Sequence, residues 1–345
     1  MKKCKGCGAI LQDIDINKEG YTLSLDKDYC QRCFRLIHYG DTSKISKEKI
    51  VNELTVKEYK NYKNELFVLI IDAFDALNLD NDDLLDYYTD HKILIIINKI
   101  DLLPKNVKDD KMEDLFKNII NKCNTSNIVG CLLTYNKDPY FNTLFIDTLN
   151  ELNVKKCVFV GRVNAGKTTI INKLLNTNDL TVSMYPGTTS STNEIVFEGF
   201  KFIDTPGLID NHSFINSLDK KLIKFLIPNK CVKPKLFQAY EPQTYFIEGL
   251  LSISVNPKRN VSLVFYIKND LEIHRTKSSN KDSFIKKHIN EYKLKYLPFT
   301  TNSFKVNKDT TLYIKGLGYI RIIGTTDVKI DIHDGIKVYK SKVKI

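Results

Sequence analysis

The chain has 345 residues, of which 42% are hydrophobic and 27% charged, a composition that excludes wholesale disorder and a fibrous repeat. No apolar run reaches the ~18 residues of a membrane span, and the basic N-terminus lacks the apolar stretch of a signal peptide. Residues 211–345 hold 25 basic and 11 acidic residues (+14), whereas residues 1–210 hold 27 and 30 (−3). We therefore expect a soluble, cytoplasmic protein of two or three domains whose basic end binds a polyanion.

Four of the eight cysteines form two C-x-x-C pairs that are separated by 22 residues. Two such turns can aim four thiolates at one point, which is the tetrahedral arrangement that Zn²⁺ takes. No catalytic carboxylate accompanies them, so we predict a closed, structural zinc site. Two redox-active dithiols are the alternative, although residues 1–35 are short for the fold that such dithiols use. The predicted ligands are Cys4, Cys7, Cys30 and Cys33.

Apolar strand-like runs alternate with helical patterns through the middle of the chain. This alternation predicts a doubly wound α/β sheet, six-stranded and mostly parallel. The predicted strands are 65–72, 92–97, 127–133 and 155–160, the predicted helices are 109–123, 139–152 and one ending near 175, and a hairpin is predicted at 194–203.

Asn98-Lys99-Ile100-Asp101 directly follows the second of these strands. Guanine presents two adjacent N–H donors that one carboxylate can accept, and adenine does not. A carboxylate left unpaired by the wrong base is costly, so Asp101 should select GTP over ATP. We expect Asn98 to brace the base and the loop, and the Lys99 stem to pack on the ring.

Residues 161–168 spell G-x-x-x-x-G-K-T between a strand and a helix, which is the P-loop pattern. Backbone N–H groups of such a loop, together with the helix N-terminus, bind phosphates. Lys167 should reach the β- and γ-phosphates, and Thr168 should bind Mg²⁺. The predicted loop contacts are Gly161, Arg162, Val163, Asn164, Ala165, Gly166, Lys167, Thr168 and Thr169.

Asp204-Thr205-Pro206-Gly207 follows the predicted hairpin. A carboxylate at a strand end after a P-loop is placed to hold Mg²⁺ through water, and the Gly207 N–H can then reach the γ-phosphate. Between the two motifs lies Thr188-Thr189. We expect Thr189 to bind Mg²⁺ when the γ-phosphate is present, with Thr188 as the alternative.

The motifs stand in an unusual order, because Asn98 precedes Gly161 by 63 residues whereas the P-loop comes first in ordinary GTPases. The site can then form only in a circularly permuted domain, which is feasible because the termini of such domains lie close together. The permutation puts Thr189 and Gly207 at the end of the domain. A predicted helix over 214–226 leads from there into the basic region.

These motifs in this order, with the paired cysteines, resemble the YqeH type of circularly permuted GTPase. His274-Arg275-Thr276-Lys277 and Gly316-Leu317-Gly318-Tyr319-Ile320 are also similar to that family. The resemblance implies GTP hydrolysis, Mg²⁺, zinc, assembly of the small (30S) ribosomal subunit, and ribosomal RNA or a pre-ribosomal particle as partner. One departure is Thr134-Tyr135-Asn136-Lys137, which stands where the fifth GTPase motif is expected.

Hydrolysis should be slow, because Leu208 stands where many GTPases place a glutamine that orients the attacking water. Asn164 resembles the asparagine that holds a K⁺ ion near the phosphates in related GTPases. The simpler interpretation is that Asn164 braces the loop. With Lys167, Thr189 and Gly207 it completes the predicted catalytic set.

The C-terminal region alternates like β-strands over 243–268 and 311–343, with a basic helix predicted over 281–293. Lysines interleave with Tyr266, Tyr292, Tyr296, Tyr313 and Tyr319, a mixture suited to RNA phosphates and unpaired bases. The alternative is a solvated lysine surface over core tyrosines, in which His274 and Arg275 are structural. The candidate RNA contacts are His274, Arg275, Lys277, Lys286 and Lys287.

We therefore predict a zinc-binding module (1–45), a circularly permuted GTPase domain (46–212) and a β-rich α+β domain that binds RNA (213–345). The chain would be a GTPase switch whose nucleotide state controls docking on an RNA–protein assembly. The alternative is a constitutive RNA- or ribosome-binding adaptor with a structural nucleotide. A P-loop ATPase or kinase is disfavoured by Asn98 and Asp101.

Overall fold

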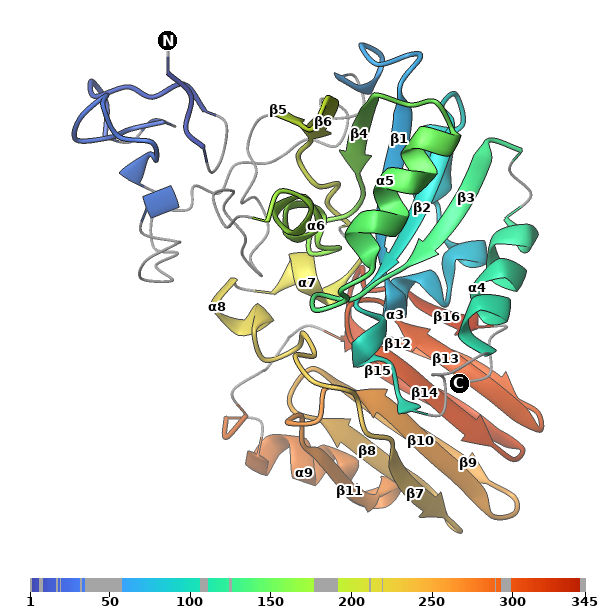
Figure 1. Cartoon of the computed structure of the whole chain (residues 1–345). Coiled ribbons are helices and arrows are strands. Elements are labelled where there is room, and N and C mark those ends of the chain that lie inside the picture. Colours follow the sequence, from blue (N-terminus) through green and yellow to red (C-terminus); the bar gives the residue numbers. More distant parts are fainter. Residues whose placement is uncertain are drawn as a thin grey trace. The chain divides into compact units, whose positions relative to one another are not determined.

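The computed structural model describes residues 2–5, 9–16, 18, 20–31, 33–34, 58–105, 111–123, 126–176, 192–210, 212–218, 220–288, 290–292 and 299–341. The chain divides into two compact units, one of residues 1–100 with 117–210 and one of residues 101–116 with 211–345 (Figure 1). The three-domain division stays a prediction. None of the described helices is both long and apolar enough to cross a membrane.

The first unit is built on a six-stranded sheet in the order β3-β2-β1-β4-β6-β5. All neighbouring strands are parallel except β5 and β6, which form an antiparallel hairpin. This arrangement confirms the predicted mostly parallel sheet. The strands are β1 (Leu66–Asp72), β2 (Ile93–Asn98), β3 (Ile128–Leu133), β4 (Lys156–Val160), β5 (Asn193–Phe197) and β6 (Phe200–Asp204).

The central strands are apolar without alternation because both of their faces are covered. Every residue from Leu66 to Ile71 is at most 4% exposed. Val68 and Ile70 of β1 belong to the core that α5 and α6 complete, and these helices lie on the same side of the sheet in Figure 1. The helical elements of this unit are α3 (Ala73–Ala76), η1 (Leu79–Asn81), η2 (Leu84–Tyr88), α5 (Phe141–Glu151) and α6 (Lys167–Leu174). Two further elements, η3 (Ile100–Leu102) and α4 (Lys111–Lys122), each have residues in both units.

The helix predicted over 214–226 is wrong as a single element. The structure has two four-residue helices instead, α7 (Phe214–Ser217) and α8 (Lys220–Ile223). Ser213 caps α7 by accepting a hydrogen bond from the Ile215 N–H, and Leu218 then adopts an extended conformation (φ −82°, ψ 156°). Because the Leu218 side chain is buried, tertiary packing ends the helix that local periodicity would have continued.

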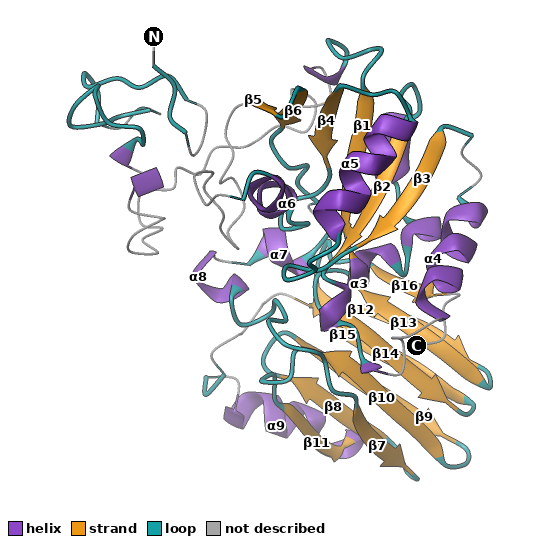
Figure 2. Ribbon diagram, viewed as in Figure 1, coloured by secondary structure: helices purple, strands orange, loops and turns teal. Residues whose placement is uncertain are grey.

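The second unit consists mainly of two antiparallel five-stranded sheets, as the strands in Figure 2 show. Their inner faces share one core, which confirms the predicted β-rich α+β fold. The first sheet has the order β16 (Val338–Ser341), β13 (Asp309–Ile314), β14 (Gly318–Ile323), β10 (Val261–Ile267), β7 (Lys235–Ala239). The second has the order β11 (Ile273–Lys277), β8 (Gln243–Ile247), β9 (Leu251–Pro257), β15 (Thr326–His333), β12 (Phe299–Val306).

The basic helix of this unit is shorter than predicted. It follows the turn η5 (Ser278–Asn280) as α9 (Lys281–His288), whereas the prediction extended it to 293. A turn closes it, because the Glu291 N–H donates to the His288 carbonyl at 2.9 Å. Lys293 lies outside the described residues.

Candidate nucleotide site

The predicted nucleotide motifs meet at one edge of the first unit's sheet. The carboxyl ends of parallel strands share an edge, and there β1 ends at Asp72, β2 at Asn98 and β6 at Asp204. The loop 161–166 leaves β4 between β1 and β6 and enters α6 at Lys167. Segments that are far apart in the sequence therefore surround this loop.

Two glycines give the loop its shape. Gly161 has φ +138°, and a Cβ there would lie 2.3 Å from the Ile70 carbonyl oxygen. Gly166 has φ +99°, and a Cβ there would lie 2.3 Å from Asn98 Nδ2. Any larger residue at either position would be strained and would also clash, so the spacing of the two glycines follows from this geometry.

Lys167 is the buried cation of the loop. Its Nζ donates to the Gly161 and Arg162 carbonyl oxygens, both at 3.2 Å. Burial lowers the pKa of Lys167 to about 8, although the carboxylate of Asp204 opposes the shift. A bound phosphate would favour the charged form, so the site is suited to an anion.

Two side-chain oxygens that could act as metal ligands lie beside the loop. Thr168 Oγ1 donates to Asp204 Oδ2 at 3.2 Å, and Asp204 is only 1% exposed. Hydroxyl and carboxylate oxygens are hard ligands of the kind that Mg²⁺ prefers. Mg²⁺ would supply charge neutralisation of the phosphates here, and Thr168 and Asp204 are the described residues that fit it.

The D-x-x-G segment runs alongside the P-loop. Thr205 Oγ1 donates to the Phe159 carbonyl at 2.7 Å, and Pro206 follows. The buried Leu208 then exchanges two backbone hydrogen bonds with the loop: the Val163 N–H donates to the Leu208 carbonyl at 3.0 Å, and the Leu208 N–H donates to the Gly161 carbonyl at 3.1 Å.

Gly207 is closely packed against the P-loop. A Cβ on this residue would lie 2.9 Å from Lys167 Nζ and 3.0 Å from Val163. The backbone of this segment is therefore positioned to respond to whatever binds at Lys167.

Residues 98–101, the predicted guanine motif, form hydrogen bonds directly with the P-loop. Asn98 Nδ2 donates to the Ala165 carbonyl at 3.0 Å, and Asn98 Oδ1 accepts from the Lys99 N–H at 2.8 Å. Lys99 Nζ donates to the Asn164 carbonyl and forms an ion pair with Asp72 at 2.8 Å. Asp101 follows in η3.

The loop at the fifth-motif position lies beside the guanine motif. The Thr134 N–H donates to the Ile97 carbonyl, and the Thr134 carbonyl accepts from the Ile100 N–H at 3.3 Å. Lys173 of α6 donates to the Tyr135 carbonyl at 2.9 Å. The loop thus has the expected place although its sequence departs from the family pattern.

Comparison with known proteins agrees with this geometry. Residues 156–264 match the family model described as "50S ribosome-binding GTPase", and residues 260–342 match the model described as "YqeH-like, C-terminal". The chain is 28% identical over 344 residues to "Uncharacterized protein YqeH" of Bacillus subtilis (strain 168), with 92% of each chain covered.

The chain contains a GTPase domain and is similar to YqeH over nearly its whole length.

Other relatives match the chain at similar or lower identity and over a smaller share of its length. A "Putative nitric oxide synthase" of Oryza sativa subsp. japonica is 24% identical over 83% of this chain, which spans 60% of the rice protein. "GTPase Der" of Aquifex aeolicus (strain VF5) is 29% identical over 51% of this chain and 42% of its own length. GTP hydrolysis to GDP and phosphate is the activity of this domain. In the chain, β2 with Asn98 comes before β4 and the P-loop, which is the permuted order of these motifs.

Sequence reasoning missed several carboxylates around this P-loop. Arg162 forms a two-pronged hydrogen bond with Asp82 (2.6 and 2.7 Å), and it also pairs with Asp83 at 2.9 Å and with Asp210 at 3.4 Å. Burial lowers the pKa of Arg162, but the carboxylates of Asp82 and Asp210 outweigh it and raise the pKa overall. Asp72 was also missed, although its place at the end of a buried strand was a usable signal.

The N-terminal cysteines form a second candidate centre. Cys4, Cys30 and Cys33 are buried, and their sulfur atoms lie within 4.8 Å of one another. The Cys30 N–H donates to the Cys4 sulfur at 3.2 Å, and the Cys33 N–H donates to the Cys30 sulfur at 3.5 Å. Three converging thiols with such donors are compatible with zinc. Cys7 lies outside the described residues.

The remaining predicted residues differ in their outcomes. Thr188 and Thr189 lie outside the described residues. Tyr266, Tyr313 and Tyr319 are at most 3% exposed, so they belong to the core, as the alternative interpretation had it. Tyr296 also lies outside the described part. The candidate RNA contacts His274, Arg275, Lys277, Lys286 and Lys287 are all exposed, on β11 and α9.

Proposed function

We propose that this YqeH-type protein is a GTP-driven switch in ribosome assembly, with its nucleotide state coupled to binding of ribosomal RNA or a pre-ribosomal particle. The contact between Leu208 and the P-loop carries this proposal. The D-x-x-G segment that senses the γ-phosphate is the last part of the GTPase domain. The chain continues from it into the +14 region, so a movement there is passed on covalently.

We assign the phosphates to Lys167 and the loop N–H groups, and the γ-phosphate to the Gly207 N–H. The proposed ligands of Mg²⁺ are Thr168, Thr189 and Asp204. Asn98, Lys99 and Asp101 read guanine. The side chains of Arg162 and Asn98, which pair with neighbouring protein groups, hold the loop in shape.

Hydrolysis in this assignment has no water-orienting glutamine, because Leu208 stands there and its side chain is 2% exposed. Asn164 has φ +67° within the loop, and its side-chain amide offers an oxygen, the kind of atom that coordinates a hard cation. We propose that Asn164 helps to hold K⁺ beside the phosphates. Turnover should therefore be faster in KCl than in NaCl at equal ionic strength. Equal rates would leave Asn164 as a brace of the loop.

We also propose that Cys7 joins Cys4, Cys30 and Cys33 in a structural zinc site. Metal analysis of the purified protein should give about one zinc per chain, and removal of zinc should unfold the N-terminal residues while GTP still binds. A protein without metal whose N-terminal residues remain folded would contradict the assignment.

The small subunit is the partner that we propose, whereas one matching family is described as binding the 50S ribosome. The deciding experiment is sedimentation of the protein with separated 30S and 50S subunits, in GDP and in a non-hydrolysable GTP analogue. A switch predicts 30S affinities that differ by roughly 5–150-fold between the two nucleotides. Equal affinities would favour the constitutive adaptor, and binding to 50S alone would refute the small-subunit proposal.

A further inference from the structure

A row of side chains crosses the outer face of the second unit's sheet beneath α9. His274, Phe246, Ser252 and Asp331 stand opposite one another on the adjacent strands β11, β8, β9 and β15. Phe284 of α9 packs onto the aromatic end of this row, 4.1 Å from His274 and 4.6 Å from Phe246 between ring centroids. Lys281 of α9 pairs with Asp331 at the other end.

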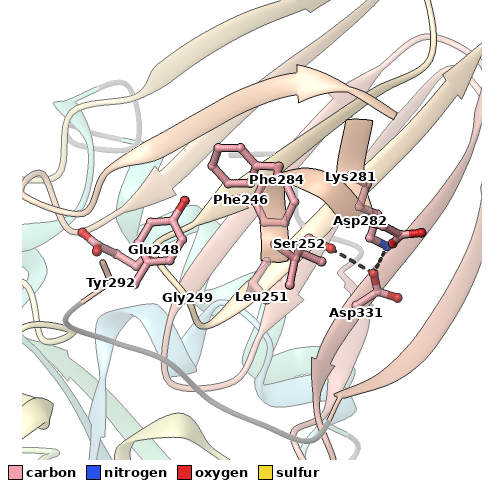
Figure 3. A pocket seen from close by; sticks show the side chains of 11 residues that line it. Phe246, Glu248, Gly249, Leu251, Ser252, Lys281, Asp282, Phe284, Tyr292 and Asp331 are labelled. Carbon is pink, nitrogen blue, oxygen red and sulfur yellow. Dashed lines mark hydrogen bonds and ion pairs between the residues drawn. The ribbon is translucent and has the colours of Figure 1, made fainter. Parts of the chain in front are cut away.

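Two pockets of about 230 and 240 Å³ flank this contact, and both are lined by Phe284 and Tyr292. The first opens between α9 and β8–β9. In Figure 3, Glu248 and Tyr292 lie side by side at one end and the Lys281–Asp331 pair lies at the other. The second pocket adds Glu272, His274, His288 and Glu291.

The charges of these pockets are opposite to those of the surrounding region. Five of the eleven acidic residues in 211–345 line them, but only one of the 25 basic residues does, Lys281. Lys281 pairs with Asp331, and Glu291 accepts a hydrogen bond from His288 at 2.7 Å. The Glu248 carboxylate accepts a hydrogen bond from the backbone N–H of Glu272 at 3.2 Å.

The carboxylates affect the pKa of the Tyr292 hydroxyl. Its pKa is raised to about 12, first by burial and then by the carboxylates of Glu248, Glu291 and Glu272. A phosphate group would be repelled by the same carboxylates, so nucleic acid is disfavoured here. A cation is attracted both by the carboxylates and by the faces of aromatic rings.

We propose that these pockets bind an arginine or lysine side chain from a basic protein segment. The aromatic rings of Phe284 and Tyr292 accommodate the alkyl stem and the charged group, and Glu248, Glu272 and Glu291 provide the counter-charge. This inference does not depend on the proposed role in ribosome assembly, because neither RNA nor nucleotide takes part in the contact.

The test uses the full-length protein and a fluorescein-labelled peptide of four Gly-Arg repeats, with binding followed by fluorescence anisotropy. A second peptide carries citrulline in place of arginine, which removes the charge and keeps the shape. We expect the arginine peptide to bind at least about tenfold more tightly than the citrulline peptide. The triple variant Glu248→Gln, Glu272→Gln, Glu291→Gln should lose about tenfold of that affinity.

The control is Glu241→Gln, because Glu241 is an exposed carboxylate of the same unit that lies outside both pockets and pairs with Lys277. It should bind the peptide as the parent does, and circular dichroism should show that all variants are folded. Equal binding of both peptides, or equal losses in the triple variant and the control, would overturn the proposal. So would binding of a single-stranded RNA that Tyr292→Ala abolishes, with no binding of the arginine peptide.

Discussion

Each of the two regions of this protein contains a site whose charge is opposite to the net charge of the region. Residues 1–210 carry −3 yet form an anion site, whereas residues 211–345 carry +14 yet concentrate carboxylates around α9. The nucleotide site relies on backbone N–H groups, a helix N-terminus and Lys167, which supply positive potential whatever the surface charge. The α9 pockets depend entirely on side chains. The sign of the charge that a site presents to its ligand therefore follows from the groups that line it and not from the net charge of its region.

The largest expected effect tests how far the anion site depends on one side chain. Lys167→Ala removes the buried ammonium that contacts the P-loop carbonyls, so GTP turnover should fall by roughly 100–1,000-fold. Binding of the arginine peptide should not change. Lys201→Ala, at an exposed lysine of β6, is the matched control and should keep full turnover. A variant that retains more than a tenth of the activity would show that the backbone donors suffice.

A second substitution tests selectivity. Asp101→Asn leaves a side chain that donates where guanine also donates, so GTP affinity should fall about 100-fold while xanthine nucleotides gain. Competition binding with GTP, XTP and ATP measures the change, and Asp90→Asn, at an exposed position, serves as the control. Unchanged preference would remove Asp101 from the site.

These sites differ in how far the sequence could predict them. The P-loop, the D-x-x-G segment and the strands β1 and β2 follow from local spacing or from unbroken apolar runs. Asp72 and Asp82 depend on contacts with Lys99 and Arg162 across 27 and 80 residues, which no local pattern records. The two pockets beside α9 draw one or two residues each from β8, β9, β11 and β15, so they too become visible only once the strands are paired. The end of α7 at Leu218 could not be predicted for the same reason, because the burial of Leu218 depends on tertiary contacts and not on local sequence.

A smaller effect concerns one of these unpredicted contacts. Asp72→Asn removes the charge that pairs with Lys99, but an asparagine can still cap α3 by accepting from the Phe74 N–H, as Asp72 does at 2.9 Å. The ion pair is partly exposed, so the affinity for both GTP and GDP should fall only about fivefold. Isothermal titration with each nucleotide measures it. A loss confined to GTP would show that Asp72 acts through the γ-phosphate and not through the guanine motif.

The smallest effect concerns Asp331, which pairs with Lys281 at one end of the first pocket beside α9. Burial alone would raise the pKa of Asp331, but hydrogen bonds from Lys281, Thr301 and Ser252 outweigh it and hold the pKa below its ordinary value. A carboxyl whose pKa is lower in the folded state stabilises the fold above the unfolded value of about 3.9 and loses that contribution as the pH falls further.

Asp331→Asn has no such proton to gain, so its unfolding midpoint should fall less steeply than that of the parent between about pH 5 and pH 3. Above about pH 5 the variant should be the less stable of the two, because Lys281 then lacks its partner charge. Thermal unfolding at several pH values, followed by circular dichroism, gives both curves. Parallel curves would mean that the Lys281–Asp331 pair contributes nothing to stability.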